Sequence, residues 1–176
     1  MRPVKTYLTP KYGTLRGKRV SNIKTFVARC LAPADDYSDQ STRERWADAM
    51  KVLNQTLGAE TCVFCGEAAD EWDHLNPILV NDKPTGYGHT IGNLVPACSA
   101  CNKSKKNRNW NLFMDGNTAL GAVDRLDRLN AYVDKFPSTP VDVSAAWVQL
   151  EPHLERIFTA FDETDRCIAE LRCSAK

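Results

Sequence analysis

The sequence lacks the features that mark membrane, secreted and fibrous proteins. Its 176 residues contain no long apolar run, no repeat of 20–50 residues and no collagen-like or heptad pattern. The first 30 residues carry basic groups every few positions and no apolar core, so they do not resemble a secretory signal. With 43% hydrophobic and 26% charged residues, the composition is that of an ordinary globular protein, which we expect to be cytoplasmic and not membrane-bound.

Acidic residues are missing from the first 34 positions. This segment holds eight Lys or Arg and no Asp or Glu, although the whole chain has a net charge of only +1, and residues 116–176 are net acidic. Such asymmetry is typical of chains that bind a polyanion. We therefore expect the N-terminal arm to contact a nucleic-acid backbone, with candidates at Arg16, Lys18 and Arg19. The alternative is a solvated tail with no partner.

The odd number of cysteines, seven, disfavours a disulfide framework. Four of them form two Cys-x-x-Cys pairs, Cys62–Cys65 and Cys98–Cys101. A two-residue gap lets both thiolates of a pair face one ion, and two such pairs predict a structural zinc site with four thiolate ligands. A redox role would suit one pair alone. The other three lack this spacing and are expected to be small apolar side chains: Cys30, Cys167 and Cys173.

Hydrophobic periodicity predicts short strands and several helices. Strands are expected near 20–27, 71–75 and 94–96, and helices over 41–57, from about 99, over 120–133 and from 147 onward. Ser41 and Glu44 have capping-box spacing, and Gly58 is the expected terminator of that helix. Pro152 predicts either a kink or the start of a new helix.

A polar run beside the cysteine pairs carries groups suited to phosphodiester hydrolysis. That reaction needs a base to deprotonate water and a cation for the charge on the leaving oxygen. His74 can serve as the base, with His89 as an alternative. Asp73, on the opposite face of a strand, can supply an oxygen ligand to Mg²⁺ or Mn²⁺. Asn102 can supply a second oxygen, or it can merely cap its helix.

Residues 62–105 resemble the HNH endonuclease family. The resemblance rests on three runs: Asp73-His74-Leu75-Asn76-Pro77, Asn93-Leu94 and Cys101-Asn102-Lys103-Ser104-Lys105. The resemblance implies a ββα-metal finger in which His74 is the general base and Asp73 and Asn102 are ligands of the catalytic Mg²⁺ or Mn²⁺. It also implies that Asn93 braces the loop between the strands. Phosphate contacts or a solvated basic face are the two interpretations of Lys103, Lys105, Lys106 and Arg108.

The family usually carries a glycine-rich turn between its Asp-His and Asn positions. Here Gly86, Gly88 and Gly92 are dispersed around Tyr87 and His89, which leaves the conformation of that loop open.

The expected fold class is α+β, with a zinc-clamped finger between two flanking regions. We expect a basic N-terminal arm plus helix over 1–60, the nuclease core with its zinc site over 61–115, and a helical region for packing or dimerisation over 116–176.

The leading functional prediction is a metal-dependent endonuclease acting on double-stranded DNA, of the restriction type. The flanking regions are long enough for target recognition, and a palindromic target would imply a homodimer. Alternatives are a homing or mobile-element nuclease, a phage packaging nuclease and a non-catalytic zinc-finger DNA-binding module. RNA remains a second possible substrate.

Overall fold

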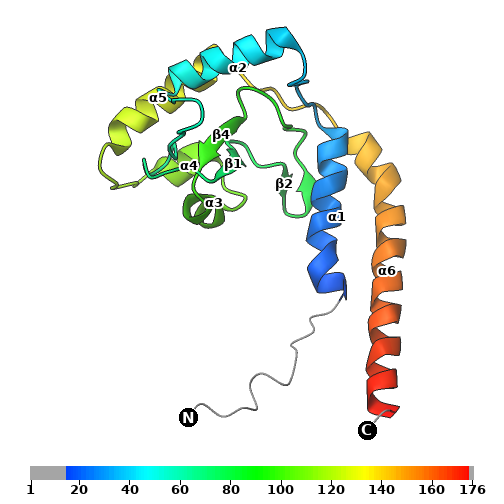
Figure 1. The fold of residues 1–176 in the computed structure, drawn as a ribbon. Helices are drawn as coiled ribbons and strands as arrows, with labels where there is room; N and C mark the ends of the chain where they lie inside the picture. Colours follow the sequence, from blue (N-terminus) through cyan, green and yellow to red (C-terminus); the bar gives the residue numbers. More distant parts are fainter. Residues whose placement is uncertain (1–14, 175–176) are drawn as a thin grey trace, which may run out of the picture.

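The computed structural model describes residues 15–174, which form an α+β fold as predicted (Figure 1). In chain order the elements are α1 (Leu15–Leu31), α2 (Gln40–Val52), β1 (Glu71–His74), β2 (Leu79–Val80), β3 (Lys83–Pro84), β4 (Leu94–Ala97), α3 (Ser99–Lys105), α4 (Trp110–Met114), α5 (Ala122–Lys135) and α6 (Ser144–Ser174). None of these helices combines the length and apolar character that a membrane span needs.

The centre of the fold is an antiparallel pair of strands followed directly by a helix. β1 pairs with β4 in a register that sets Asp73 opposite Val95 and His74 opposite Leu94. β4 is buried along its whole length, and α3 begins two residues after it ends. Both strands and the start of this helix lie where the sequence predicted them, giving the ββα order of elements.

One hydrophobic core joins all three of the regions defined from the sequence. Helices α2, α4 and α5 surround the β1–β4 pair and the first cysteine turn (Figure 1). Side chains from each of these elements are fully or almost fully buried together, among them Met50, Phe64, Leu75, Val95, Trp110 and Leu129. The finger therefore packs on helices that come from both ends of the chain.

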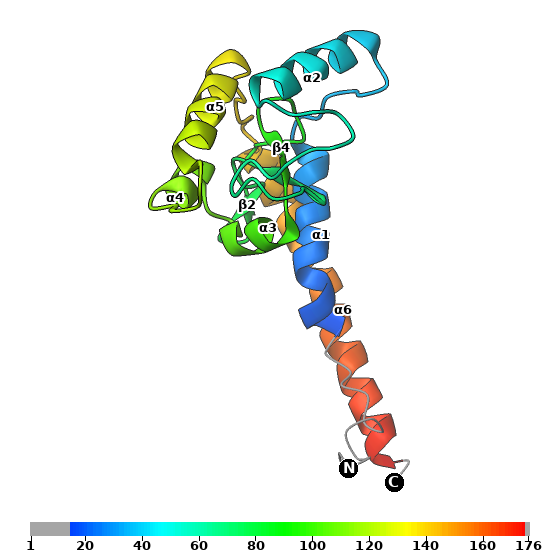
Figure 2. The ribbon, with the colours of Figure 1, turned by 60° about the vertical axis from the view of Figure 1, so that its left-hand side comes forward.

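The first and last described helices lie side by side (Figures 1 and 2). Trp147, Leu154 and Phe158 of α6 form a second core against one face of α1, made by Val20, Ile23, Val27 and Leu31. α6 runs without interruption through Pro152 and projects well past the end of α1 (Figure 2). Of the two expectations for this proline, the start of a new helix is not seen, since Pro152 lies inside one continuous helix.

Two local predictions were wrong. The segment 20–27, expected as a strand, is helical because its apolar residues recur at helical spacing and are covered by α6. The second helix begins after Asp39, whose carboxylate accepts the Thr42 N–H bond at 3.0 Å, so the cap is Asp39 rather than Ser41. That helix ends at Val52 rather than at the predicted residue 57, so Gly58 does not terminate it, and Leu57 is 58% exposed.

The loop between β1 and β4 contains the small β2–β3 hairpin, turned by Asn81 and Asp82 with φ of 50° and 63°. Its dispersed glycines allow other parts of the chain to approach. A Cβ on Gly88 would lie 1.7 Å from the Pro33 carbonyl oxygen, and one on Gly92 would lie 2.0 Å from the Phe136 carbonyl oxygen. The glycines thus serve packing against the segments after α1 and α5.

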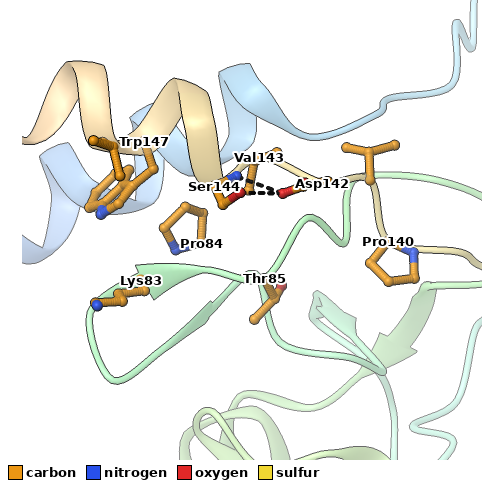
Figure 3. Close-up of a pocket in the computed structure, with 10 residues that line it drawn as sticks. Lys83, Pro84, Thr85, Pro140, Asp142, Val143, Ser144 and Trp147 are labelled. Carbon is orange, nitrogen blue, oxygen red and sulfur yellow. Dashed lines mark hydrogen bonds between the residues drawn. The ribbon is translucent and has the colours of Figure 1, made fainter.

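A cavity of about 460 Å³ lies between the β2–β3 hairpin and the start of α6 (Figure 3). Its lining includes Pro84, Val141 and Trp147, and Asp142 caps α6 by accepting hydrogen bonds from the N–H and hydroxyl of Ser144. None of the residues predicted to act in catalysis or zinc binding lines this cavity.

Candidate active site and zinc centre

The four paired cysteines meet at one point. Their sulfur atoms all lie within 4.8 Å of one another. The first pair sits in a tight turn closed by the Gly66 N–H bond to the Cys62 carbonyl, and Val63 N–H attaches this turn to β4 through the Pro96 carbonyl. The second pair opens α3, where the Cys98 sulfur accepts a hydrogen bond from Cys101 N–H.

The geometry of this cluster fits a zinc ion. Four ligands at the usual Zn–S distance of ~2.3 Å would place neighbouring sulfurs about 3.8 Å apart in a tetrahedron. The Cys65 and Cys98 sulfurs are 3.6 Å apart. Burial raises the pKa of the Cys65 and Cys101 thiols, so a cation is needed to hold them as thiolates. The four cysteines are therefore positioned to bind structural zinc.

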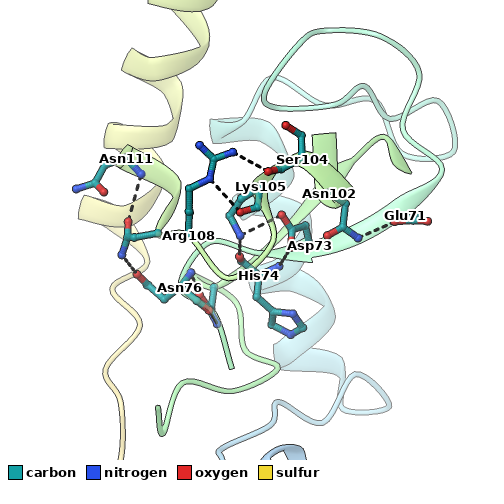
Figure 4. Close-up of polar contacts among 11 residues, drawn as sticks. Glu71, Asp73, His74, Asn76, Asn102, Ser104, Lys105, Arg108 and Asn111 are labelled. Atoms are coloured by element: carbon teal, nitrogen blue, oxygen red, sulfur yellow. Dashed lines mark hydrogen bonds and ion pairs between the residues drawn. The ribbon is translucent and has the colours of Figure 1, made fainter. Parts of the chain in front are cut away.

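Asp73 is buried on β1 beneath the end of α3. Its Oδ1 accepts the His74 N–H bond at 2.8 Å, and its Oδ2 lies 3.2 Å from Lys105 Nζ in an ion pair (Figure 4). Burial raises the pKa of this carboxyl, while the Lys105 ammonium opposes the rise. Apart from this ammonium, Oδ2 has no partner among the residues described. A carboxylate oxygen is the ligand type that a hard cation prefers.

Asn102 lies on α3 next to the same carboxylate. Its Nδ2 donates to Glu71 Oε2 at 2.6 Å, so the amide is held in place by a residue on β1 that the sequence analysis did not single out (Figure 4). Asp73, Asn102 and Lys105 line one polar cavity of about 240 Å³. One carboxylate and one amide oxygen in such a cavity fit a Mg²⁺ or Mn²⁺ ion that keeps most of its water.

His74 directs its imidazole away from the Asp73–Lys105 pair, as expected for neighbours on a strand (Figure 4). Burial, then the nearby His89, Arg29 and Lys105 charges, lower its pKa to about 3. Its Nε2 is buried without a hydrogen-bond partner among the described residues. The ring of His89 lies 5.4 Å from that of His74. His74 is thus a neutral imidazole at physiological pH, the form that can accept a proton.

Asn93 is fully buried and ties the loop between the strands together. Its Oδ1 accepts the Asn76 N–H bond at 2.7 Å, and its Nδ2 donates to the Gly88 carbonyl at 3.0 Å. Tyr132 of α5, which the sequence analysis missed, supports the same turn. Its hydroxyl donates to the Leu94 carbonyl at 2.9 Å and accepts the Gly92 N–H bond at 2.8 Å.

The basic residues predicted as DNA contacts occupy different environments. Lys103, Lys106 and Arg19 are exposed, whereas Lys105 is only 1% exposed and donates to the His74 carbonyl at 2.6 Å. Arg108 folds back onto α3 and donates to the Ser104 carbonyl at 2.6 Å. The side chains of Arg16 and Lys18, and residues 1–14, lie outside what the structure describes.

Sequence analysis also missed one wall of the cavity, which α1 provides. Ser21, Thr25 and Arg29 line it, at positions i, i+4 and i+8 on one stripe of the helix. The apolar stripe of α1 faces α6 instead. Helical periodicity in residues 20–31 was the signal that could have shown this two-sided helix.

Residues 62–108 match the model of the HNH endonuclease family. This segment contains the cysteine cluster, both strands of the central pair and α3, together with Asp73, His74 and Asn102. Over this segment, which is about a quarter of the chain, the protein is therefore similar to HNH endonucleases. Neither the curated proteins nor the solved structures contain a significant match to the chain.

Neutral, partly buried His74 should make the fold less stable in acid. The unfolded chain takes up this proton near pH 6.5, whereas the folded chain takes it up only near its lowered pKa of about 3. Stability is therefore lost as pH falls below 6.5, by up to ~1.4 kcal/mol per pH unit for this one group.

We expect urea unfolding at pH 7, 6 and 5 to show a steeper decline for the wild type than for His74→Asn. His153→Asn, which removes an exposed imidazole, should keep the wild-type slope. Equal slopes for the wild type and His74→Asn would show that folding does not suppress this protonation.

Proposed function

We propose that the protein is a metal-dependent endonuclease that hydrolyses phosphodiester bonds of double-stranded DNA. The observation that carries this proposal is the placement of Asp73, His74 and Asn102 around one polar cavity. The Asp73 carboxylate, paired with Lys105, and the neutral His74 imidazole both line this cavity, and Glu71 holds the Asn102 amide in place. A zinc-binding role alone would not require these three groups.

Each residue has a separate task in this proposal. His74 takes the proton from the attacking water, because its imidazole is neutral and lies beside the cavity. Asp73 and Asn102 hold a Mg²⁺ or Mn²⁺ ion, which would supply electrostatic stabilisation of the charge developing on the leaving oxygen. Asn93 keeps the loop that follows His74 in one conformation. The four cysteines fix the start of α3, and thereby Asn102.

Within this class we propose a restriction-type enzyme, with the homing and packaging roles as alternatives. Support comes from the extent of chain outside the HNH segment, since α1, α2, α5 and α6 all lie outside residues 62–108. We propose that Arg19, Lys103, Lys106 and the basic arm contact DNA phosphates. The side chains of Arg19, Lys103 and Lys106 are exposed, and none of them forms an ion pair with another residue that the structure describes. Dimerisation through the helical C-terminal region belongs to the same proposal.

Plasmid nicking tests the proposal directly. We expect cleavage of supercoiled DNA with Mg²⁺ or Mn²⁺ and none with EDTA. Asp73→Asn should lower the rate by ~10² or more, because the cation loses its only protein carboxylate. This variant also leaves Lys105 buried without its counter-charge, so Asp73→Asn with Lys105→Met is the matched variant. Cleavage by the double variant at the wild-type rate would contradict the assignment.

A non-catalytic zinc-finger module is the second candidate. It would bind DNA but leave the plasmid intact under every metal condition. The wild-type protein in the same assay therefore separates the two functions.

A further inference from the structure

The cavity that contains Asp73 and His74 has a second wall made by α1. Three attachments fix that helix in place. Ala28 packs against Ile78 and Leu79 of the hairpin region, and Lys24 forms a 3.3 Å ion pair with Asp82. The chain after α1 is held by the His89 N–H bond to the Pro33 carbonyl, at 2.9 Å. The position of α1 relative to the catalytic residues is therefore defined by packing, charge and backbone contacts.

Arg29 is the cation that this wall presents to the cavity. It is exposed, it lines the cavity with Asp73 and His74, and it has no hydrogen bond or ion pair among residues 19–174. Its positive charge reaches both imidazoles of the site, since after burial it is among the causes that lower the pKa of His74 and of His89.

Of the other charged residues of the cavity, Asp73, Asp82 and Lys105 are engaged in ion pairs, whereas Lys106 is a second exposed cation on the α3 side. Lys105 faces Asp73, and Asp82 is paired with Lys24. Lys106 is exposed just beyond the end of α3. Arg29 is thus the uncompensated cation on the α1 side, across from the carboxylate on β1. A phosphodiester in the cavity would carry a negative charge between them, and a guanidinium binds two phosphate oxygens at once.

We infer that Arg29 is a catalytic residue that holds the non-bridging oxygens of the scissile phosphate from the α1 side of the cavity. The inference rests on the proposed nuclease function. In the reaction the water oxygen bonds to phosphorus, its proton goes to the His74 imidazole, and the bond from phosphorus to the leaving oxygen breaks with its electron pair on that oxygen, which solvent protonates. Arg29 exchanges no proton or electron pair. It stabilises the charge that gathers on the non-bridging oxygens.

Steady-state kinetics on a duplex substrate test the role. Arg29→Gln is expected to lower kcat by ~10²–10³, the effect typical of losing one donor to a transition-state oxyanion, with a smaller change in KM. Arg29→Lys should recover part of kcat because it keeps the charge but not the two-pronged contact. Arg166→Gln is the matched control, an exposed arginine of α6 outside the cavity, and it should keep the wild-type kcat. A kcat within threefold of wild type for Arg29→Gln would overturn the inference.

Binding without metal separates this inference from the proposed function. The probe is a fluorescein-labelled 20-base-pair duplex in EDTA, titrated at several salt concentrations. If Arg29 contacts a phosphate, Arg29→Gln should flatten the slope of log affinity against log salt by about 1. Wild-type protein that binds but never cleaves would reject the nuclease function. An unchanged slope in Arg29→Gln would reject the phosphate contact. If this variant melts at a lower temperature but keeps the wild-type kcat, Arg29 has only a structural role.

Discussion

A protein with Cys98→Ser and Cys101→Ser is expected to bind no zinc and to fail to fold. The two thiolates open α3 and close the cluster that joins the first cysteine turn to β4. Four-cysteine sites of this kind contribute ~10–16 kcal/mol of apparent binding free energy at pH 7, which exceeds the stability of a typical domain. Circular dichroism and elemental analysis of the purified variant measure both losses.

Cys167→Ser with Cys173→Ser is the matched control. Both residues are exposed on α6 and lie outside the cluster, so this protein should keep one zinc per chain and its fold. Chelation of the wild type should reproduce the unfolding, and added zinc should reverse it. A folded, zinc-free double variant at positions 98 and 101 would contradict a structural zinc.

His74→Ala is expected to abolish detectable cleavage while zinc content and DNA binding stay nearly unchanged. Removal of the general base costs ~10²–10⁴ in rate. The substitution deletes a partly buried imidazole whose Nε2 has no partner in the described chain, so no protein hydrogen bond of that atom is lost. The assay is plasmid nicking across a series of Mg²⁺ and Mn²⁺ concentrations, with binding measured in parallel.

Metal titration distinguishes the base from the ligands. High Mn²⁺ should partly rescue Asn102→Ala, because the remaining Asp73 carboxylate still binds the ion. It should not rescue His74→Ala, since a cation does not replace a missing proton acceptor. His89→Ala is the companion variant, because the centre of its ring lies 5.4 Å from that of His74. If His74→Ala cleaves at nearly the wild-type rate and His89→Ala does not cleave, the general base is His89.

The sequence was sufficient to predict the central ββα order and the zinc cluster because their residues are close in the chain and fixed in spacing. Cys62, Cys65, Cys98 and Cys101 meet as their spacing implied, and strands and helix begin near the expected residues. Asn93 also makes the loop hydrogen bonds that the family resemblance implied.

Features that depend on distant partners were not predictable in this way. Lys105 is a lysine at the end of a short basic helix, and nothing local shows that it is buried against Asp73. The helical state of residues 20–27 depends on α6, more than 100 residues later, because that helix covers its apolar stripe. The place of Arg29 beside His74 depends on contacts of α1 with the hairpin region, which is also distant in the chain, so the wall of the cavity could not be inferred from the motif alone.

The pairing of α1 with α6 also sets an order of events during synthesis. Chains begin to fold from the N-terminus as they leave the ribosome. The zinc cluster is complete once Cys101 has emerged, but the apolar side of α1 stays uncovered until Trp147, Leu154 and Phe158 follow. In a nascent chain this apolar side of α1 is therefore among the last surfaces to be covered, although the contacts of α1 with the hairpin region are available earlier.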